Sequence, residues 1–461
     1  MIDFLLDRMK ACRDAIGVAT PAGTCTYGKL LARVHAWQAR VANLPVGSVV
    51  SIEGDYGPES IAVFLALTWA GHVAVPLSPD SRAHHESFVE IADVEFRVRL
   101  DGARGQAGDL EPTRRHAGHP FYLTLREQGH PGLVLFSSGS TGRPKAAVHD
   151  LSRLLPKYRL PRQRYRTLVF LLLDHIGGVN TLFYTIANGG AVVLANGRSP
   201  AAVCDAIERH QVELLPTSPT FLNLLLLSGE AARRDLSSLR LITYGTEPMP
   251  PSTLEQACRT FPHARFLQTY GLTELGILRS QSRDSNSLWV RIGGEDFEWK
   301  VLNDRLWIRA RSAMLGYLNA PSPFDADGFF DTGDLVEVDG EWIRFLGRNN
   351  DAINVGGSKV HPVEVENVLL QMDNVADVAV HGEPHALTGQ IVVAKIRLAR
   401  PEAPAEFKLR MRRFCSERLA AYQVPAKVQF TSEPMHSARF KRVRSGDAAP
   451  VSALRASDPA A

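Results

Sequence analysis

The stretch Val134-Leu-Phe-Ser-Ser-Gly-Ser-Thr-Gly-Arg-Pro-Lys-Ala-Ala-Val-His149 decides the fold. The apolar residues from Leu133 to Phe136 predict a buried strand, and those from Ala146 to Val148 predict a second one. Glycines, hydroxyl side chains and two cations lie between them. Glycine lets backbone N–H groups converge, and converging N–H groups bind anions. The stretch therefore predicts a phosphate-binding bend between two strands.

This bend is not a Walker A loop, which needs Gly-Lys-Ser/Thr at the start of a helix. Here Arg143 and Pro144 separate Lys145 from Gly142, and proline suits a loop better than a helix interior. A surface turn rich in serine and glycine is the alternative for such a stretch taken alone.

The composition favours a large enzyme over a nucleic-acid or membrane protein. The chain has 461 residues, 45% of them hydrophobic, and a formal net charge of +3, so ~150 residues per domain gives two or three domains. Its five cysteines are scattered without a CxxC pair, which argues against a zinc site or a disulfide framework. The N-terminus lacks the form of a signal peptide, and no apolar run reaches the ~18–20 residues of a membrane span. We expect a cytoplasmic protein.

Strand-like and helix-like segments alternate along the chain. Residues 27–41 and 60–70 have apolar residues at helical spacing, whereas residues 49–54 and 167–173 read as buried strands. Residues 102–119 are rich in Gly, Arg and His and predict a loop. Alternation of this kind predicts an α/β fold with stacked, mainly parallel sheets and flanking helices.

Two further motifs follow the bend in the chain. They are Tyr270-Gly-Leu-Thr-Glu274 and Phe330-Asp-Thr-Gly-Asp-Leu335. With the bend, they resemble the adenylate-forming superfamily, which comprises acyl-CoA synthetases, adenylation domains of peptide synthetases and luciferases. The resemblance extends over roughly residues 5–444 and is nearest to stand-alone acyl- or aryl-CoA ligases.

The resemblance implies a site for ATP. The residues expected at the phosphates are Ser137, Ser138, Gly139, Ser140, Thr141, Gly142 and Lys145. Those expected around the adenosine are Gly245, Thr246, Glu247, Tyr270, Gly271, Asp334 and Arg348. Tyr270 would stack on adenine, and Asp334 and Arg348 would contact the ribose.

The resemblance also implies three catalytic residues. Thr273 would donate to the α-phosphate and Glu274 would hold Mg²⁺, an ion that favours one or two carboxylates plus nucleotide phosphates. Lys441 would be the catalytic lysine, although Phe440 replaces the family glycine and the spacing from Pro434 is one residue longer. A basic surface strip is the alternative for this segment.

The acid pocket is expected at Asp174, His175, Gly177 and Gly178. His175 fits the family histidine near the acyl group, and a helix cap or core histidine is the alternative. Asp174 would cap the following helix or meet a polar or amine-bearing substrate; we favour the cap. The two glycines leave room for an aromatic ring or serve packing, and we favour a small or aromatic acid.

Three segments follow from the resemblance. Residues 1–349 would form the N-terminal domain that binds ATP and the acid, and residues 350–446 a small, mobile α/β domain. Residues 447–461 would be a disordered tail. The hinge would lie near Asn350, where relatives have Asp or Lys, and Gly356 and Gly357 would line a tunnel for the thiol.

The implied reaction is activation of a carboxylic acid as acyl-AMP, followed by transfer to a thiol, with CoA the first choice. A stand-alone enzyme that passes the activated group to a carrier-protein phosphopantetheine, an amine or another small nucleophile is the first alternative. A non-catalytic ligand-binding relative is a second, suggested by the altered lysine segment, and a light-emitting relative is remote. The protein would be a monomer or a homodimer.

Overall fold

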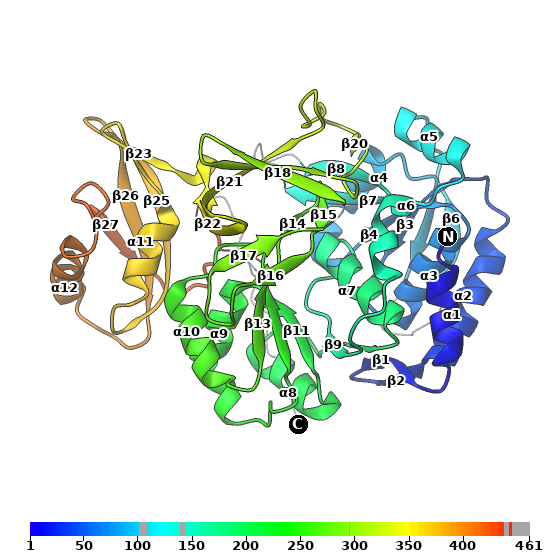
Figure 1. Ribbon diagram of the computed structural model, residues 1–461, viewed down its shortest axis with the longest axis horizontal. Coiled ribbons are helices and arrows are strands. Elements are labelled where there is room, and N and C mark those ends of the chain that lie inside the picture. Colours follow the sequence, from blue (N-terminus) through cyan, green and yellow to red (C-terminus); the bar gives the residue numbers. More distant parts are fainter. Residues whose placement is uncertain (101–107, 139–143, 295, 438–441, 445–461) are drawn as a thin grey trace, which may run out of the picture.

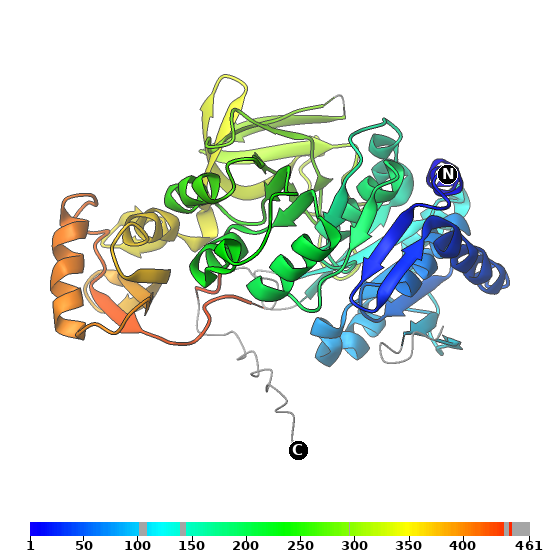
Figure 2. The ribbon, with the colours of Figure 1, turned by 90° about the horizontal axis from the view of Figure 1, so that it is seen from below.

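The computed structural model describes residues 1–100, 108–138, 144–294, 296–437 and 442–444. The molecule is elongated, with helices α1 and α2 at one end and a small domain carrying α12 at the other (Figures 1 and 2). Four phosphate-bend residues, Gly139, Ser140, Thr141 and Gly142, lie outside the described ranges, as do Phe440, Lys441 and the predicted tail.

Two seven-stranded sheets form the large domain. The first, sheet A, has the order β13 (Arg265–Gln268), β12 (Leu241–Tyr244), β11 (Leu214–Thr217), β9 (Arg166–Leu168), β10 (Ala191–Val193), β1 (Ile16–Thr20) and β2 (Gly23–Thr26). Its strands are parallel except for the β1–β2 hairpin.

The second, sheet B, has the order β20 (Gly316–Tyr317), β8 (Pro144–Asp150), β7 (Gly132–Ser138), β4 (Val73–Leu77), β3 (Val49–Glu53), β5 (Phe96–Arg99) and β6 (Leu110–Pro112). Strands β5, β3, β4 and β7 are parallel, and β6, β8 and β20 run antiparallel to their neighbours.

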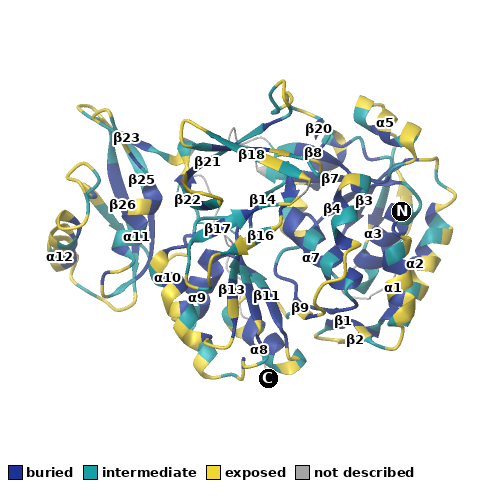
Figure 3. Ribbon diagram, viewed as in Figure 1, coloured by how far each residue is buried: buried dark blue, intermediate teal, exposed yellow. Residues whose placement is uncertain are grey.

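Helices fill the space between the sheets and cover their outer faces. Helices α2 (Tyr27–Val41), α3 (Pro58–Trp69) and α7 (Ile176–Ala187) share one core with both sheets. Helices α8 (Pro200–His210), α9 (Pro219–Ser228) and α10 (Pro251–Thr260) cover the far face of sheet A, and α4 (His85–Ile91) and α5 (Pro120–Gln128) that of sheet B. Figure 3 shows α3 buried and α2 exposed along one side. The short helices α1 (Asp3–Ala11) and α6 (Leu151–Leu154) complete this part.

Helix α2 shows why its sequence predicts a helix. Thr26 caps its N-terminus by accepting from the Lys29 N–H, and Tyr27, Leu30, Val34, Trp37 and Val41 recur at helical spacing and are buried. Helix α3 is buried nearly all round and packs on α2.

A third sheet is antiparallel and closes the large domain. Its order is β16 (Ser280–Ser282), β17 (Trp289–Ile292), β22 (Trp342–Arg348), β21 (Phe330–Asp339), β19 (Arg305–Ala310) and β18 (Phe297–Leu302). The small hairpin of β14 (Gly271–Leu272) and β15 (Gly276–Ile277) lies beside it (Figure 1).

The small domain follows β22 through the 3-10 turn η4 (Asn349–Asp351). It contains β23 (Ile353–Val355), β24 (Ser358–Val360), β25 (Val375–His385), β26 (Gly389–Leu398) and β27 (Lys427–Phe430), with helices α11 (Pro362–Leu369) and α12 (Pro404–Ser416). Residues from Ile353 to Val428 share a separate hydrophobic core.

The predicted α/β class with stacked, mainly parallel sheets is confirmed, and two local predictions are wrong. The strand expected over residues 167–173 ends at Leu168, because the chain leaves the sheet there to approach α7. Within the segment expected to be a loop, Leu110–Pro112 form the edge strand β6. None of the helices in the described ranges has the length and apolarity that crossing a bilayer requires.

Candidate active site

The phosphate bend lies at the end of the β7–β8 hairpin. Ser137 pairs with Lys145 and Ser138 with Pro144 across the two strands, so both predicted strands are present. The Lys145 Nζ lies 5.2 Å from the centroid of the Tyr317 ring. The strands that flank the predicted bend therefore pair up to Ser138 and Pro144.

Tyr317 contacts both Lys145 and Glu274, the predicted magnesium ligand. Glu274 lies in the turn between β14 and β15, directly after Thr273, and its Oε1 accepts from the Tyr317 hydroxyl at 2.5 Å. Burial, followed by the charge of Glu274, raises the pKa of Tyr317 above its ordinary value, so the phenol remains a donor. Sequence reasoning assigned Tyr317 no role, because residues 274 and 317 are brought together only by the tertiary fold.

Tyr270, Asp334 and Arg348 form the second predicted cluster. The Tyr270 hydroxyl donates to Asp334 Oδ2 at 2.6 Å, and Arg348 Nε donates to Asp334 Oδ1 at 3.2 Å. Burial raises the pKa of Asp334 above its ordinary value, against the opposing effects of Arg348 and Tyr270. The Tyr270 ring stacks on Phe345, with centroids 4.5 Å apart. The three predicted residues are therefore adjacent, and their contacts with adenine and ribose stay predictions.

The loop after β12 has a constrained backbone. Thr246 has a φ of 75°, in the left-handed region that costs an ordinary residue roughly 1–2 kcal/mol. A Cβ on Gly245 would lie 2.6 Å from the Thr269 carbonyl oxygen, so only glycine fits. A Cβ on Gly271 would likewise lie 2.6 Å from the Gly276 carbonyl oxygen. Such backbone strain in a loop points to function.

Glu247 in this loop connects the two domains. Its Oε1 accepts from the Thr220 N–H at 2.8 Å, near the start of α9, and its Oε2 accepts from the Arg442 N–H at 3.2 Å. Lys441 directly precedes Arg442 in the sequence. The segment that follows the predicted catalytic lysine therefore contacts a loop predicted to line the nucleotide.

Residues 442–444, here called the C-terminal strap, are fixed by buried ion pairs. Arg442 contacts Glu366 at 3.1 Å and Asp377 at 3.2 Å, and Arg444 contacts Glu366 and Asp351, each at 2.9 Å. The Arg442, Glu366 and Asp377 side chains are at most 7% exposed. Burial works to raise the pKa of Glu366, yet Arg442 and Arg444 hold that pKa below its ordinary value.

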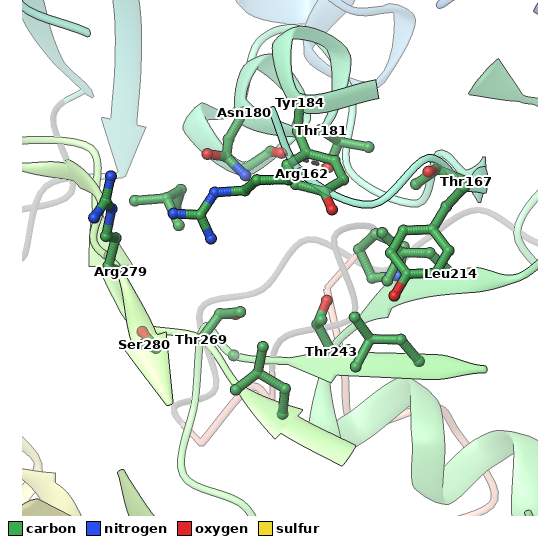
Figure 4. A pocket seen from close by; sticks show the side chains of 18 of the residues that line it. Arg162, Thr167, Asn180, Thr181, Tyr184, Leu214, Thr243, Thr269, Arg279 and Ser280 are labelled. Atoms are coloured by element: carbon green, nitrogen blue, oxygen red, sulfur yellow. Dashed lines mark hydrogen bonds between the residues drawn. The ribbon is translucent and has the colours of Figure 1, made fainter. Parts of the chain in front are cut away.

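A cavity of about 530 Å³ lies between α7 and sheet A (Figure 4). Alternate residues of β12, Leu241 and Thr243, face it, as does Gly245 directly after the strand. Ile242 and Tyr244 pack into the core on the opposite face. Helix α7 faces the cavity with residues three or four positions apart: Gly177, Asn180, Thr181 and Tyr184.

Some of the predicted pocket residues line this cavity and others do not. His175 and Gly177 line it, and the His175 side chain caps α7 by accepting from the Gly177 N–H at 3.0 Å. The prediction that Asp174 caps this helix is wrong. Asp174 instead accepts from the Ser78 hydroxyl at 2.5 Å and is not among the cavity-lining residues.

Gly178 is a packing residue and does not line the cavity. A Cβ there would lie 1.9 Å from the Leu172 carbonyl oxygen, so the chain before α7 packs directly on it. Packing, the alternative for both glycines, therefore describes Gly178, and a role of Gly177 in making room for the acid stays a prediction.

Gly356 and Gly357 form the turn between β23 and β24, with φ values of 57° and 89°. Both are exposed, and neither lines the cavity. Asn350 lies in η4, between the last strand of the large domain and the first of the small domain. Their predicted roles as thiol tunnel and hinge stay predictions.

A large domain that holds the predicted nucleotide residues, joined to a small domain whose last segment reaches them, defines an AMP-forming ligase. The AMP-binding enzyme family matches residues 7–318, and the AMP-binding enzyme C-terminal domain matches residues 364–441. The chain belongs to the AMP-binding enzyme family.

Three comparisons describe its relatives. The 2-succinylbenzoate–CoA ligase of Bacillus subtilis (strain 168) is 31% identical over 92% of this chain and 93% of its own length. The indoleacetate–CoA ligase of Aromatoleum aromaticum is 27% identical over 93% of each chain. The crystal structure of the anthranilate CoA ligase AuaEII with anthranoyl-AMP matches with a TM-score of 0.80 at 22% identity, covering 96% of this chain and 95% of that one, which shows the shared fold.

Proposed function

We propose that this ligase activates an aromatic or small carboxylic acid with ATP and transfers the acyl group to CoA. The cavity supports this substrate: it combines apolar side chains for a ring or short chain with His175 and Gly177 at the start of α7. The curated relatives support the acceptor, since both are named CoA ligases of acids that contain an aromatic ring.

In the first half-reaction a carboxylate oxygen attacks the α-phosphorus of ATP. The new P–O bond gives the acyl adenylate, and pyrophosphate leaves with the electrons of the broken P–O bond. Charge accumulates on phosphoryl oxygens, so catalysis depends on positioning and electrostatics. Lys145, the Thr273 hydroxyl and Lys441 would neutralise that charge.

The residues present fit a magnesium ion. Mg²⁺ takes one or two carboxylates plus nucleotide phosphates, and Glu274 is a carboxylate held in place by Tyr317 beside the phosphate bend. Among the described residues, no cluster of three or more His, Cys, Asp or Glu side chains could bind a metal by itself. When bound, the ion would neutralise phosphate charge.

In the second half-reaction the thiolate of CoA attacks the acyl carbon and AMP leaves. We place the domain boundary after Asn349 and the hinge near Asn350, inside η4. Rotation there would withdraw the strap from Glu247 and bring the turn at Gly356 and Gly357 towards the acyl group. The Glu247–Arg442 contact is the observation that carries this assignment, because it ties the lysine-bearing segment to the nucleotide loop before rotation.

The test is pyrophosphate exchange into ATP over a panel of aryl, short-chain, long-chain and amino acids, followed by mass analysis of products with CoA, a carrier protein or an amine as acceptor. Lys441→Ala should lower the exchange rate by about 10²–10³-fold, the effect of removing one electrostatic donor. Lys408→Ala, on the exposed face of α12, is the matched control. Exchange that survives in Lys441→Ala would remove the lysine from the mechanism, and absence of exchange with every acid would favour a ligand-binding relative.

A further inference from the structure

Three cations share one side of the acid cavity. Lys157 comes from the 3-10 turn at Pro156–Tyr158, Arg162 from the loop before β9, and Arg279 from the segment between β15 and β16. Figure 4 shows Arg162 and Arg279 extending into the same space, with Asn180 of α7 beside them. Positive charge from three separate segments therefore converges on one region.

Lys157 is held in place by the cavity wall. Its Nζ donates to Asn180 Oδ1 at 2.9 Å and to the Ile277 carbonyl oxygen at 2.8 Å, and the Tyr158 hydroxyl donates to the same Asn180 oxygen at 2.8 Å. An ammonium group has three N–H donors, so one is left to point elsewhere. Burial, followed by the charges of Arg162 and Arg279, lowers the pKa of Lys157 to about 7.

No carboxylate balances these cations from the cavity. None of the described lining residues is an aspartate or a glutamate. Across the described part of the chain, no carboxylate lies within ion-pair distance of Lys157, Arg162 or Arg279. Like charges that converge in a partly buried space repel one another unless a ligand supplies the opposite charge.

The positions of the cations along the cavity indicate how far the ligand's balancing charge would lie from its reacting carboxylate. Under the proposed function, the reacting carboxylate would lie near Gly177, at the start of α7, and Gly245, directly after β12, whereas Asn180 and Tyr184 lie further along the helix. At ~1.5 Å per residue, these two residues are about 5 and 10 Å from Gly177 along the axis. Leu241, Leu267 and Ile277 line the cavity as well and offer apolar surface for the part of the substrate between its two ends.

We propose that the acid carries a second anionic group, such as a carboxylate, which Lys157, Arg162 and Arg279 bind about 5–10 Å from the reacting carboxylate. This inference rests on the proposed function, because it assigns the chemistry of the same acid. It makes the substrate a dianion with an apolar or aromatic middle, and it makes the three cations specificity-determining residues.

The test compares aryl and aliphatic diacids with their monomethyl esters, which keep the shape and one carboxylate but lose the second charge. Pyrophosphate exchange is measured for each pair, and the readout is the ratio of kcat/KM for diacid to kcat/KM for ester. We expect a ratio of at least ~10 in the unaltered enzyme, since a charge-assisted hydrogen bond at this depth contributes roughly 10–100-fold.

Substitutions test whether these arginines cause the preference for diacids over monoesters. Arg162→Gln with Arg279→Gln should lower the ratio by about 10–100-fold, and both side chains are exposed at the cavity, so folding should tolerate the change. Arg159→Gln is the matched control, because Arg159 lies in the same segment but contacts the Phe4 ring and does not line the cavity. Thermal unfolding of each variant confirms that it is folded.

The outcomes separate the two proposals. Exchange with no acid at all contradicts the proposed function. Exchange with esters or simple monoacids that equals that with diacids leaves the function standing and overturns the second anionic group. A diacid preference that persists in the double variant would move the anion site elsewhere.

Discussion

The C-terminal strap and the acid cavity both gather cations, but they treat them in opposite ways. In the strap, Arg442 and Arg444 are matched by Glu366, Asp377 and Asp351 at hydrogen-bond distance. In the cavity, Lys157 donates to Asn180 and a backbone carbonyl, Arg162 and Arg279 line the same space, and no described lining residue is acidic.

This difference distinguishes charged side chains that stabilise the fold from charged side chains that bind a ligand. A buried cation that is paired with carboxylates needs no ligand to balance its charge, so these ion pairs fix the strap to the small domain. Cations that line an open cavity without carboxylates gain a partner of opposite charge only when an anion binds. The same residue type therefore has two functions, decided by its neighbours.

The largest effect should come from breaking the matched cluster. Arg442→Met leaves Asp377 without its arginine and Glu366 with only Arg444, and a buried charge that loses its partner costs about 3–5 kcal/mol. We expect faster amide hydrogen exchange in β25 and α11, read by mass spectrometry because a two-domain chain does not unfold in a single step.

The control for this experiment is Arg418→Met, because Arg418 pairs with Glu417 on the surface at 3.0 Å. An exposed pair contributes about 0–1 kcal/mol, so exchange should hardly change. Equal effects of the two substitutions would mean that the strap is not fixed by its ion pairs.

A smaller effect should appear when pH removes one unmatched charge. Because a bound anion favours charged Lys157, binding a diacid raises the pKa of Lys157 from about 7 and takes up a proton. Affinity should therefore fall as pH rises above 7, by at most about tenfold per pH unit, until the raised pKa is passed. The other titratable groups that line the cavity are Arg162, Arg265, Arg279, His175, Tyr158, Tyr165 and Tyr184.

Calorimetry of a diacid without ATP, in two buffers of different ionisation enthalpy, measures the protons taken up. The monomethyl ester should show a flat profile over the same range. Identical pH profiles for diacid and ester would place the second carboxylate away from Lys157.

The smallest effect should come from the contact between the C-terminal strap and Glu247 in the loop after β12. Glu247→Gln keeps one oxygen for the Thr220 or Arg442 N–H but replaces the other by a donor. Losing one such hydrogen bond corresponds to about 0.5–1.5 kcal/mol, or roughly 2–10-fold. The adenylation rate should fall by that factor while thioester formation from preformed acyl adenylate holds steady; a selective loss of the second step would reverse the assignment.

Local sequence was sufficient where one element carries the signal. The spacing of apolar residues predicted α2 from Tyr27 to Val41, and the order of apolar, glycine-rich and apolar segments predicted the two strands β7 and β8. The prediction for residues 167–173 failed because an apolar run does not reveal whether its burial comes from a sheet or from packing beside a helix.

The site was less accessible to sequence reasoning, because its key contacts join distant residues. Asp174 and His175 are neighbours in sequence, yet His175 faces the cavity and caps α7 while Asp174 turns towards Ser78. Tyr317 and Phe345 entered the site only through the packing of the third sheet and β20.

By itself, the sequence determined the α/β class, the two strands that flank the predicted phosphate bend and the family, since these depend on short motifs and on periodicity within single elements. Only the tertiary structure decided which charges are matched, because an ion pair depends on distance in space. Arg442 and Arg162 look alike in the sequence; one meets Glu366 and Asp377 in a buried cluster, and the other faces a cavity without a carboxylate among its described walls.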